Sequence, residues 1–337
     1  MSFINFLTMV TEHIKEYLPE ETQDASISIL KRQKNNDVTS HELFIKMPED
    51  AIVCKIYMKE FYKQYENGIS MKSILEQIAE EYISNRTDTA NGIGYWFLDY
   101  EKVKDRLVLK VVNRDKNASL LKTIAHKDLE NTDLTVIYMV LMDIKMQSSI
   151  SINVEKNHLR FWGIEGNELY QVALENTERF CPAQIGHIKD VMSELEGGEK
   201  KEQKELSDYV IEPYNQYVLS NEQRIRGATV MLYPDVLQRL AENAGGNLFI
   251  MPSSTNEILL IKDDGKLTAA ELQAIVVDTN RKYVEPEEFL SNEVFYYDRE
   301  EQSLSIATDK EQTKELLERL GSKRGSDEME NEWEQEV

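Results

Sequence analysis

The residues best suited to chemistry are polar side chains between two apolar segments in the second half of the chain. Ser253, Ser254 and Asn256 belong to the run Pro-Ser-Ser-Thr-Asn-Glu that begins at Pro252. A serine hydroxyl can attack a substrate or bind a polar ligand, but attack needs a neighbouring base, and no G-x-S-x-G sequence surrounds either serine. Ser, Thr and Asn are also the residues with which a turn satisfies its own backbone. The sequence favours the turn.

Two arginines stand out against an acidic composition. Arg224 and Arg226 lie on either side of Ile225. A guanidinium group can bind a carboxylate or phosphate through two parallel hydrogen bonds, so the pair could hold an anionic ligand. The alternative is that both form ion pairs with neighbouring acids. We favour the ion pairs, and keep these arginines with the two serines and Asn256 as candidate ligand-binding residues.

Histidine and cysteine positions predict neither a metal site nor a disulfide framework. No two of the histidines have the i, i+4 spacing of a helical metal site, and no H-E-x-x-H sequence occurs. Cys54 and Cys181 lie far apart in the chain. The glycine pair in Asn91-Gly-Ile-Gly94 lacks the context of a phosphate-binding loop. We therefore expect no metal and no cofactor. The histidines are His13, His41, His126, His158 and His187.

The formal charge of −22 sets limits on the partners. It repels phosphate backbones and so disfavours direct binding of DNA or RNA. An acidic body could instead mimic nucleic acid and bind a basic protein. No apolar run reaches the roughly 20 residues that cross a bilayer, and the first 18 residues lack the pattern of a secretory signal. Together with the cysteine usage, this predicts a cytoplasmic protein.

Periodic apolar residues predict an alternation of helices and strands in the first half of the chain. The run 134–142 is equally compatible with a strand and a buried helix, because periodicity cannot separate the two over so short a stretch. Asn and Asp within 34–37 predict the turn of a hairpin. We expect helices over residues 3–18, 71–83 and 167–178, and strands over residues 25–29, 43–47, 52–58, 107–112 and 150–154.

The second half carries clear start and stop signals. Pro234 suits the first turn of a helix that Gly245 and Gly246 end. Thr268 and Glu271 have the spacing of a capping box at the start of the next helix. We expect strands over residues 247–251 and 257–262 around a turn at 252–256, a hairpin of 294–297 with 303–307, and a last helix over 309–320.

This pattern predicts an α+β fold in which hairpins build mixed or antiparallel sheets with flanking helices. We expect two domains. The charged segment 194–208 is the predicted linker between an N-terminal domain, 1–193, and a C-terminal domain, 209–320. Residues 321–337 are predicted to form an acidic, disordered tail.

Several stretches resemble an uncharacterised family of bacterial proteins, over roughly residues 3–306. They are Tyr100-Glu-Lys-Val-Lys-Asp105, His158-Leu-Arg-Phe-Trp-Gly163, Glu175-Asn-Thr177, Tyr217-Val-Leu-Ser220, Gly227-Ala-Thr-Val-Met-Leu-Tyr-Pro234, Asn247-Leu-Phe-Ile-Met-Pro-Ser-Ser254 and Val294-Phe-Tyr-Tyr-Asp298. The resemblance implies a bacterial origin and a shared architecture, and it implies no activity. Members often carry His where this chain has Asn256, so a Ser–His pair at that turn would lack its base here.

The absence of a recognisable nucleophile, metal site or nucleotide-binding loop favours a non-catalytic binding or regulatory protein. Its partner would be a protein or a small molecule, and the sequence leaves the oligomeric state open. The alternative is a hydrolase-like enzyme that uses Ser253, Ser254 and Arg226. A second alternative is the acidic mimic of nucleic acid. Sequence alone does not decide whether the chain is an enzyme, because active sites are assembled in space.

Overall fold

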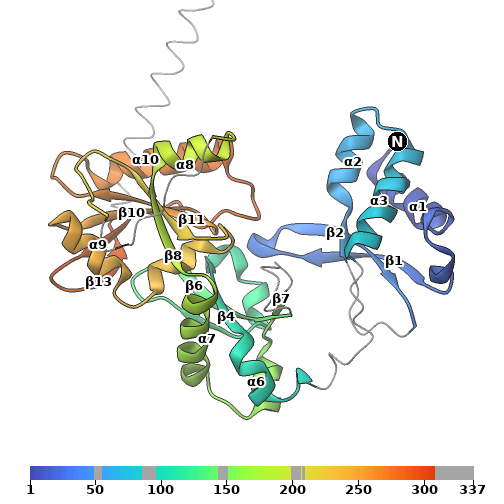
Figure 1. Cartoon of the computed structure of the whole chain (residues 1–337), viewed down its shortest axis with the longest axis horizontal. Coiled ribbons are helices and arrows are strands. Elements are labelled where there is room, and N and C mark those ends of the chain that lie inside the picture. Colours follow the sequence, from blue (N-terminus) through green and yellow to red (C-terminus); the bar gives the residue numbers. More distant parts are fainter. Residues whose placement is uncertain (49–54, 86–95, 143–150, 199–205, 207–208, 308–337) are drawn as a thin grey trace, which may run out of the picture. The chain divides into compact units, whose positions relative to one another are not determined.

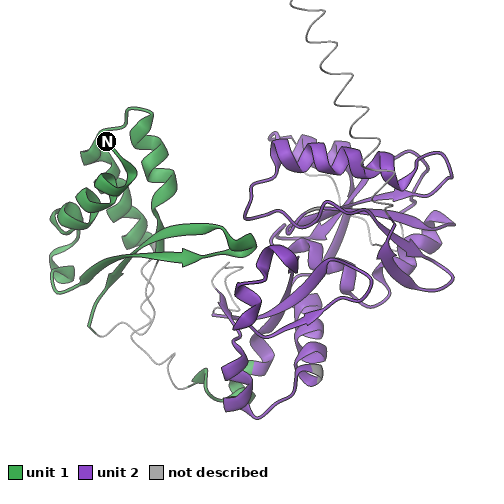
Figure 2. Ribbon diagram, turned by 180° about the vertical axis from the view of Figure 1, so that it is seen from behind, with its two compact units in different colours: residues 1–103 green, residues 104–337 purple. Residues whose placement is uncertain are grey.

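The computed structural model describes residues 1–48, 55–85, 96–142, 151–198, 206 and 209–307. The chain divides into two compact units, Met1–Val103 and Lys104–Val337 (Figure 2). Within the described ranges, all strands pair antiparallel and helices flank the sheets. The predicted α+β class is therefore confirmed. No helix in these ranges is long and apolar enough to cross a membrane.

The first unit packs helices on a sheet in the order β1-β2-β3 (Figure 1). The predicted hairpin is β1 paired with β2, and its turn places Asn36 and Asp37 at positive φ, which Asn and Asp tolerate. The helices are α1 (Phe3–His13), α2 (Met58–Glu66), α3 (Met71–Asn85) and the short α5 (Tyr100–Val103). The strands are β1 (Ser26–Gln33), β2 (Thr39–Lys46) and β3 (Lys55–Tyr57). Positions 52–54 of the predicted third strand, including Cys54, lie outside the described residues.

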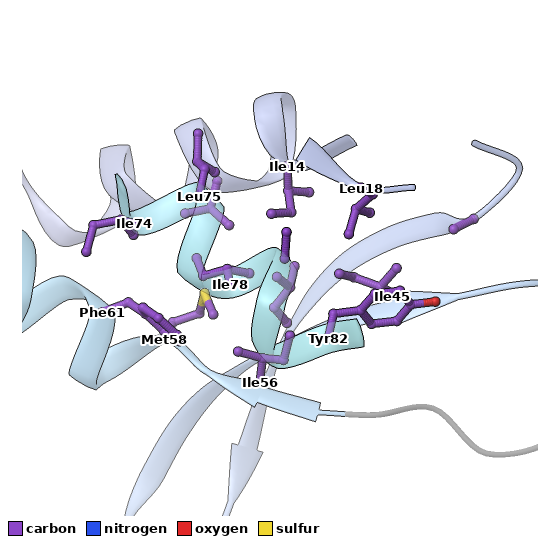
Figure 3. Close-up of a cluster of buried hydrophobic side chains, with 14 of the residues drawn as sticks. Ile14, Leu18, Ile45, Ile56, Met58, Phe61, Ile74, Leu75, Ile78 and Tyr82 are labelled. Atoms are coloured by element: carbon purple, nitrogen blue, oxygen red, sulfur yellow. The ribbon is translucent and has the colours of Figure 1, made fainter. Parts of the chain in front are cut away.

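One apolar cluster holds this unit together (Figure 3). Ile45 and Ile56 come from the strands, and Ile14, Ile78 and Tyr82 come from the helical segments, and all are almost fully buried. They meet because α3 places every third or fourth residue on one face while each strand alternates its side chains. The burial of apolar area in this cluster is the main stabilising force of the unit.

The second unit contains two sheets. The smaller has the order β4-β6-β5, with β7 also paired to β6. All of β6 is buried, and the ambiguous run is a strand that pairs with β4 from Leu134 to Val140. Helix α7 packs against β4. The elements are β4 (Leu107–Asn113), β5 (His126–Asp128), β6 (Leu134–Leu141), β7 (Ser151–Asn153), α6 (Lys156–Trp162) and α7 (Gly166–Phe180).

The larger sheet has the order β13-β12-β10-β11-β9-β8. Its strands are β8 (Ala183–His187), β9 (Tyr217–Asn221), β10 (Leu248–Ser254), β11 (Glu257–Lys262), β12 (Phe295–Asp298) and β13 (Ser303–Ile306). Helices α8 (Ile188–Leu195), α9 (Val236–Ala244) and α10 (Ala269–Tyr283) and the 3-10 helix η8 (Gly227–Leu232) connect them. The predicted end of α9 and the start of α10 are confirmed, since Gly245 ends α9 in a left-handed conformation and Thr268 and Glu271 form the capping box of α10. Pro234 lies before α9, which follows Asp235, and not in its first turn as predicted.

The structure corrects two boundaries. The compact units divide at residues 103 and 104, whereas the sequence placed the boundary at 194–208. The reason is that β8 and β9, on either side of that charged segment, pair along their whole length and share one sheet. Strand β10 also continues to Ser254, beyond the predicted end, because a register shift between Met251 and Ser254 accommodates Pro252. The predicted helix 309–320 and tail 321–337 lie outside the described residues.

Candidate functional site

The site is built where the loop after β9 meets the turn between β10 and β11. The hydroxyl of Ser220 donates to the backbone oxygen of Asn256 over 2.6 Å, and the N–H of Ala228 donates to the oxygen of Thr255 over 3.2 Å. Between these contacts lies Gly227. A Cβ atom at this position would overlap both the Ser220 hydroxyl and the Asn256 backbone oxygen. Only glycine therefore allows the loop and the turn to approach so closely.

The loop itself is held in an unusual backbone conformation. Arg224 and Arg226 both have positive φ, at 51° and 56°. A non-glycine residue there costs on the order of 1–2 kcal/mol. Asn221 offsets part of this cost: its side-chain amide donates to the Ile225 oxygen over 2.8 Å, and its side-chain oxygen accepts from the Ile225 N–H. The chain thus stabilises a strained loop that carries both arginines.

Asn256 organises the polar turn. Its side-chain oxygen accepts from the backbone N–H of Arg226 over 3.0 Å, and its side-chain amide donates to Glu288 over 3.0 Å. Its own N–H donates to the Ser254 hydroxyl over 3.1 Å. Ser254 and Asn256 therefore act as turn residues, as the sequence favoured. Ser253 lies in β10, two residues after Met251.

Arg224 and Arg226 have different surroundings. The guanidinium of Arg224 forms an ion pair with Glu194, at the end of α8, over 2.9 Å. This is the ion-pair alternative that the sequence favoured. The guanidinium of Arg226 instead donates to the hydroxyl of Ser151 over 3.3 Å, and in the part of the chain that the structure describes it forms no ion pair. The arginine that remains available for a ligand is therefore Arg226.

Burial and neighbouring groups set the charge state around Arg226. Burial lowers the pKa of its guanidinium, and Cys181 and Tyr233 oppose this shift. Burial raises the pKa of the Cys181 thiol, although nearby Arg226 lowers it. The Tyr233 hydroxyl donates to the Cys181 backbone oxygen over 2.8 Å. A thiol with a raised pKa is a weak nucleophile, so Cys181 is poorly suited to covalent catalysis.

Lys110 joins this site from the other sheet, and the sequence interpretation did not include it. It is half-buried in β4, whose other residues are all buried. Burial and, to a lesser extent, Arg226 lower its pKa to about 8, although Glu288 and Glu287 oppose the shift. No residue described by the structure forms an ion pair with it. The signal in the sequence was a single lysine within the apolar run 107–112.

A perturbed carboxylate lies near the same loop. Burial raises the pKa of Glu257, at the start of β11, while Arg224 lowers it and Glu288 raises it further. Arg224 thus acts on the charge of Glu257 and also forms an ion pair with Glu194. This carboxylate could accept a proton near neutral pH more readily than an exposed glutamate.

The described cavities lie elsewhere. A surface cavity of about 650 Å³ is lined by Arg114, Asn131 and Ile306 among others, next to the hydrogen bond from the Ile306 N–H to the Asn131 oxygen. None of the five candidate residues lines it.

Among the described residues, no group of three or more His, Cys, Asp or Glu side chains could hold a metal ion. His158 and His187 instead cap the starts of α6 and α8.

Comparison with known proteins gives a family and no activity. A family model described as a family of unknown function (DUF5688) matches residues 3–299 of the chain. This agrees with the resemblance to an uncharacterised family noted from the sequence. No curated protein and no solved structure matches the chain.

Proposed function

This chain belongs to the DUF5688 family of unknown function, and we propose that it is a non-catalytic binding protein of the bacterial cytoplasm whose ligand contacts Arg226. The ligand is a small molecule or the exposed side chain of a protein. Two cysteines without a disulfide pattern favour the cytoplasm. The likeness of the sequence to bacterial proteins favours the bacterial origin.

The observation that carries the proposal is the state of the Arg226 side chain. A guanidinium has five N–H donors, and one of them donates to Ser151. Burying a charge without a partner costs free energy, so chains seldom keep such a residue for stability. Here the chain also accepts a left-handed backbone at Arg226 and fixes its N–H on Asn256. These costs are consistent with a residue that is kept for a ligand.

The surroundings support binding over catalysis. The Ser254 hydroxyl accepts the N–H of Asn256, and Asn256 stands where a base would be needed. The thiol of Cys181 has a raised pKa. The hydrolase-like alternative would need one of these groups to be activated. Ser254 and Asn256 are instead engaged in hydrogen bonds of the turn, and the raised pKa of Cys181 disfavours its thiolate.

The proposal is tested by measuring the thermal unfolding of the full chain in the presence of each compound of a metabolite collection. We expect at least one ligand to raise the Tm of the wild type while the Arg226→Gln variant no longer responds. Arg224→Gln is the matched control, because it removes an arginine of similar backbone conformation that already has an acidic partner. Each ligand that binds is then followed by mass spectrometry for conversion. A product that forms with the wild type and is lost in Ser254→Ala would overturn the proposal in favour of the enzyme.

A further inference from the structure

We infer that Arg226 and Lys110 together bind the phosphate group of a small molecule. This inference rests on the proposed function and names the class of its ligand. It is drawn from the position of Lys110 beside the arginine loop, from the absence of an ion pair at either cation among the described residues, and from the charge that the two present together.

A chain of hydrogen bonds places Lys110 next to the loop of Arg226. Lys110 lies on β4, which forms one edge of its sheet. The next residue, Val111, donates its N–H to the hydroxyl of Thr229 over 3.3 Å. Thr229 in turn donates its N–H to the backbone oxygen of Arg226 over 3.1 Å. The start of η8 is therefore fixed against the strand edge at Lys110, and the two cations are held by separate sheets.

The two cations lie near each other, and neither forms an ion pair with a residue that the structure describes. The hydrogen bonds through Val111 and Thr229 hold the two residues near each other, and Arg226 accordingly lowers the pKa of Lys110. The acids that face Lys110 are Glu288 and Glu287, and Glu288 already accepts the side-chain amide of Asn256. Neither acid forms an ion pair with the lysine in the described residues. An anion bound between the cations would remove this repulsion and supply the missing partner.

The number of donors on the two cations favours phosphate over a single carboxylate. A phosphate monoester carries between about 1.5 and 2 negative charges at pH 7 and offers three acceptor oxygens. A guanidinium binds two of these oxygens in a fork, while an ammonium acts as a point charge on the same group. A polyanion such as DNA or RNA is disfavoured by the overall charge of −22. The combination fits a small phosphate ester.

Calorimetric titration of the full chain with phenyl phosphate, at constant ionic strength and pH 7, tests the inference. We expect saturable binding to the wild type, at least tenfold weaker binding to Lys110→Met and to Arg226→Gln, and unchanged binding to Arg224→Gln. Succinate and inorganic sulfate are titrated in parallel. If succinate binds at the same site and phenyl phosphate does not, the phosphate assignment is overturned.

The pH dependence gives a second measurement. Phenyl phosphate stays a dianion above about pH 7, whereas the Lys110 ammonium loses its proton as the pH passes about 8. The affinity of the wild type should therefore fall at least severalfold between pH 7 and pH 9, and that of Lys110→Met should stay nearly flat. The other titratable groups that face this site, Cys181 and Tyr233 beside Arg226 and the two glutamates beside Lys110, are present in both proteins.

The outcomes separate the inference from the proposed function. If other ligands depend on Arg226 but phenyl phosphate does not bind, or if Lys110→Met binds it as well as the wild type, the inference is wrong and the binding function stands. If phenyl phosphate is hydrolysed in a reaction that Ser254→Ala abolishes, the non-catalytic proposal fails even though the phosphate is recognised.

Discussion

The backbone N–H of Arg226 donates to the side-chain oxygen of Asn256 over 3.0 Å. This hydrogen bond joins the loop after β9 to the turn between β10 and β11. Strands β9 and β11 are far apart in the sequence but adjacent in the sheet. Asn256 thereby fixes the backbone of Arg226 and leaves the guanidinium group to other partners. Its role is to position Arg226, and the arginine itself would touch the ligand.

We expect Asn256→Ala to weaken both the fold and the proposed binding. The variant leaves the N–H of Arg226 and the carboxylate of Glu288 without their side-chain partner, which costs about 1–3 kcal/mol of unfolding free energy. Urea denaturation gives this value, and phenyl phosphate titration gives the affinity. Ser254→Ala is the matched control, because it removes only the acceptor of the Asn256 N–H. Equal stability and affinity of Asn256→Ala and the wild type would contradict the positioning role.

Gly227→Ala should destabilise the protein by at least about 2 kcal/mol, because the new methyl group meets the backbone oxygen of Asn256, which cannot rotate away. Gly246→Ala provides the comparison. Its Cβ would lie 3.6 Å from Cε of Lys262, an ordinary contact. We expect that second change to stay within about 1 kcal/mol of the wild type in chemical denaturation. If both variants unfold at the same denaturant concentration, the close approach at Gly227 is not a constraint.

Lys110→Met should raise the unfolding free energy at pH 7 by about 1–3 kcal/mol. The pKa of the lysine is about 8 in the folded protein and near 10.4 in an unfolded chain, so its protonated form is disfavoured by folding. Between these two values the unfolded state binds more protons, and the stability of the wild type rises with pH. The advantage of the variant should therefore shrink from pH 8 to pH 10. Guanidinium denaturation of both proteins at several pH values measures it, and a difference independent of pH would contradict the cause.

Ile78→Ala should cost about 2–5 kcal/mol in the first unit, since Ile78 is fully buried in a cluster made only of residues from that unit. Ile83, on the same helix, is 51% exposed, and Ile83→Ala should change stability by less than about 0.5 kcal/mol. Calorimetric unfolding of the full chain measures both. Phenyl phosphate binding should survive Ile78→Ala, because the site lies in the second unit.

Local signals were sufficient for much of the fold. The capping box of α10 depends on Thr268 and Glu271, three residues apart, and the end of α9 depends on Gly245. Both could be predicted because the interacting groups are neighbours in the chain. The run 134–142 could not be assigned in this way. It is a strand because β4 supplies hydrogen-bond partners along its length, and that pairing is a tertiary interaction.

The candidate site was only partly predictable for the same reason. Arg226 could be proposed from its sequence, but its lack of an acidic partner, and the ion pair of Arg224 with Glu194, depend on which elements the fold brings near. Lys110 was missed because its importance comes from η8, which follows much later in the chain. The predicted boundary at 194–208 failed because a charged segment resembles a linker even when the strands on its two sides pair with each other.

The short helix η8 is hydrogen-bonded to both sheets of the second unit, so we expect it to link their local unfolding. Through Ala228 it is hydrogen-bonded to the turn that follows β10, and through Thr229 to the edge of β4. Neither sheet can separate from it without breaking buried hydrogen bonds. Amide hydrogens in β4 and β10 should therefore exchange with solvent through one shared opening event, with similar free energies. A ligand bound at the start of η8 would slow exchange in both sheets together.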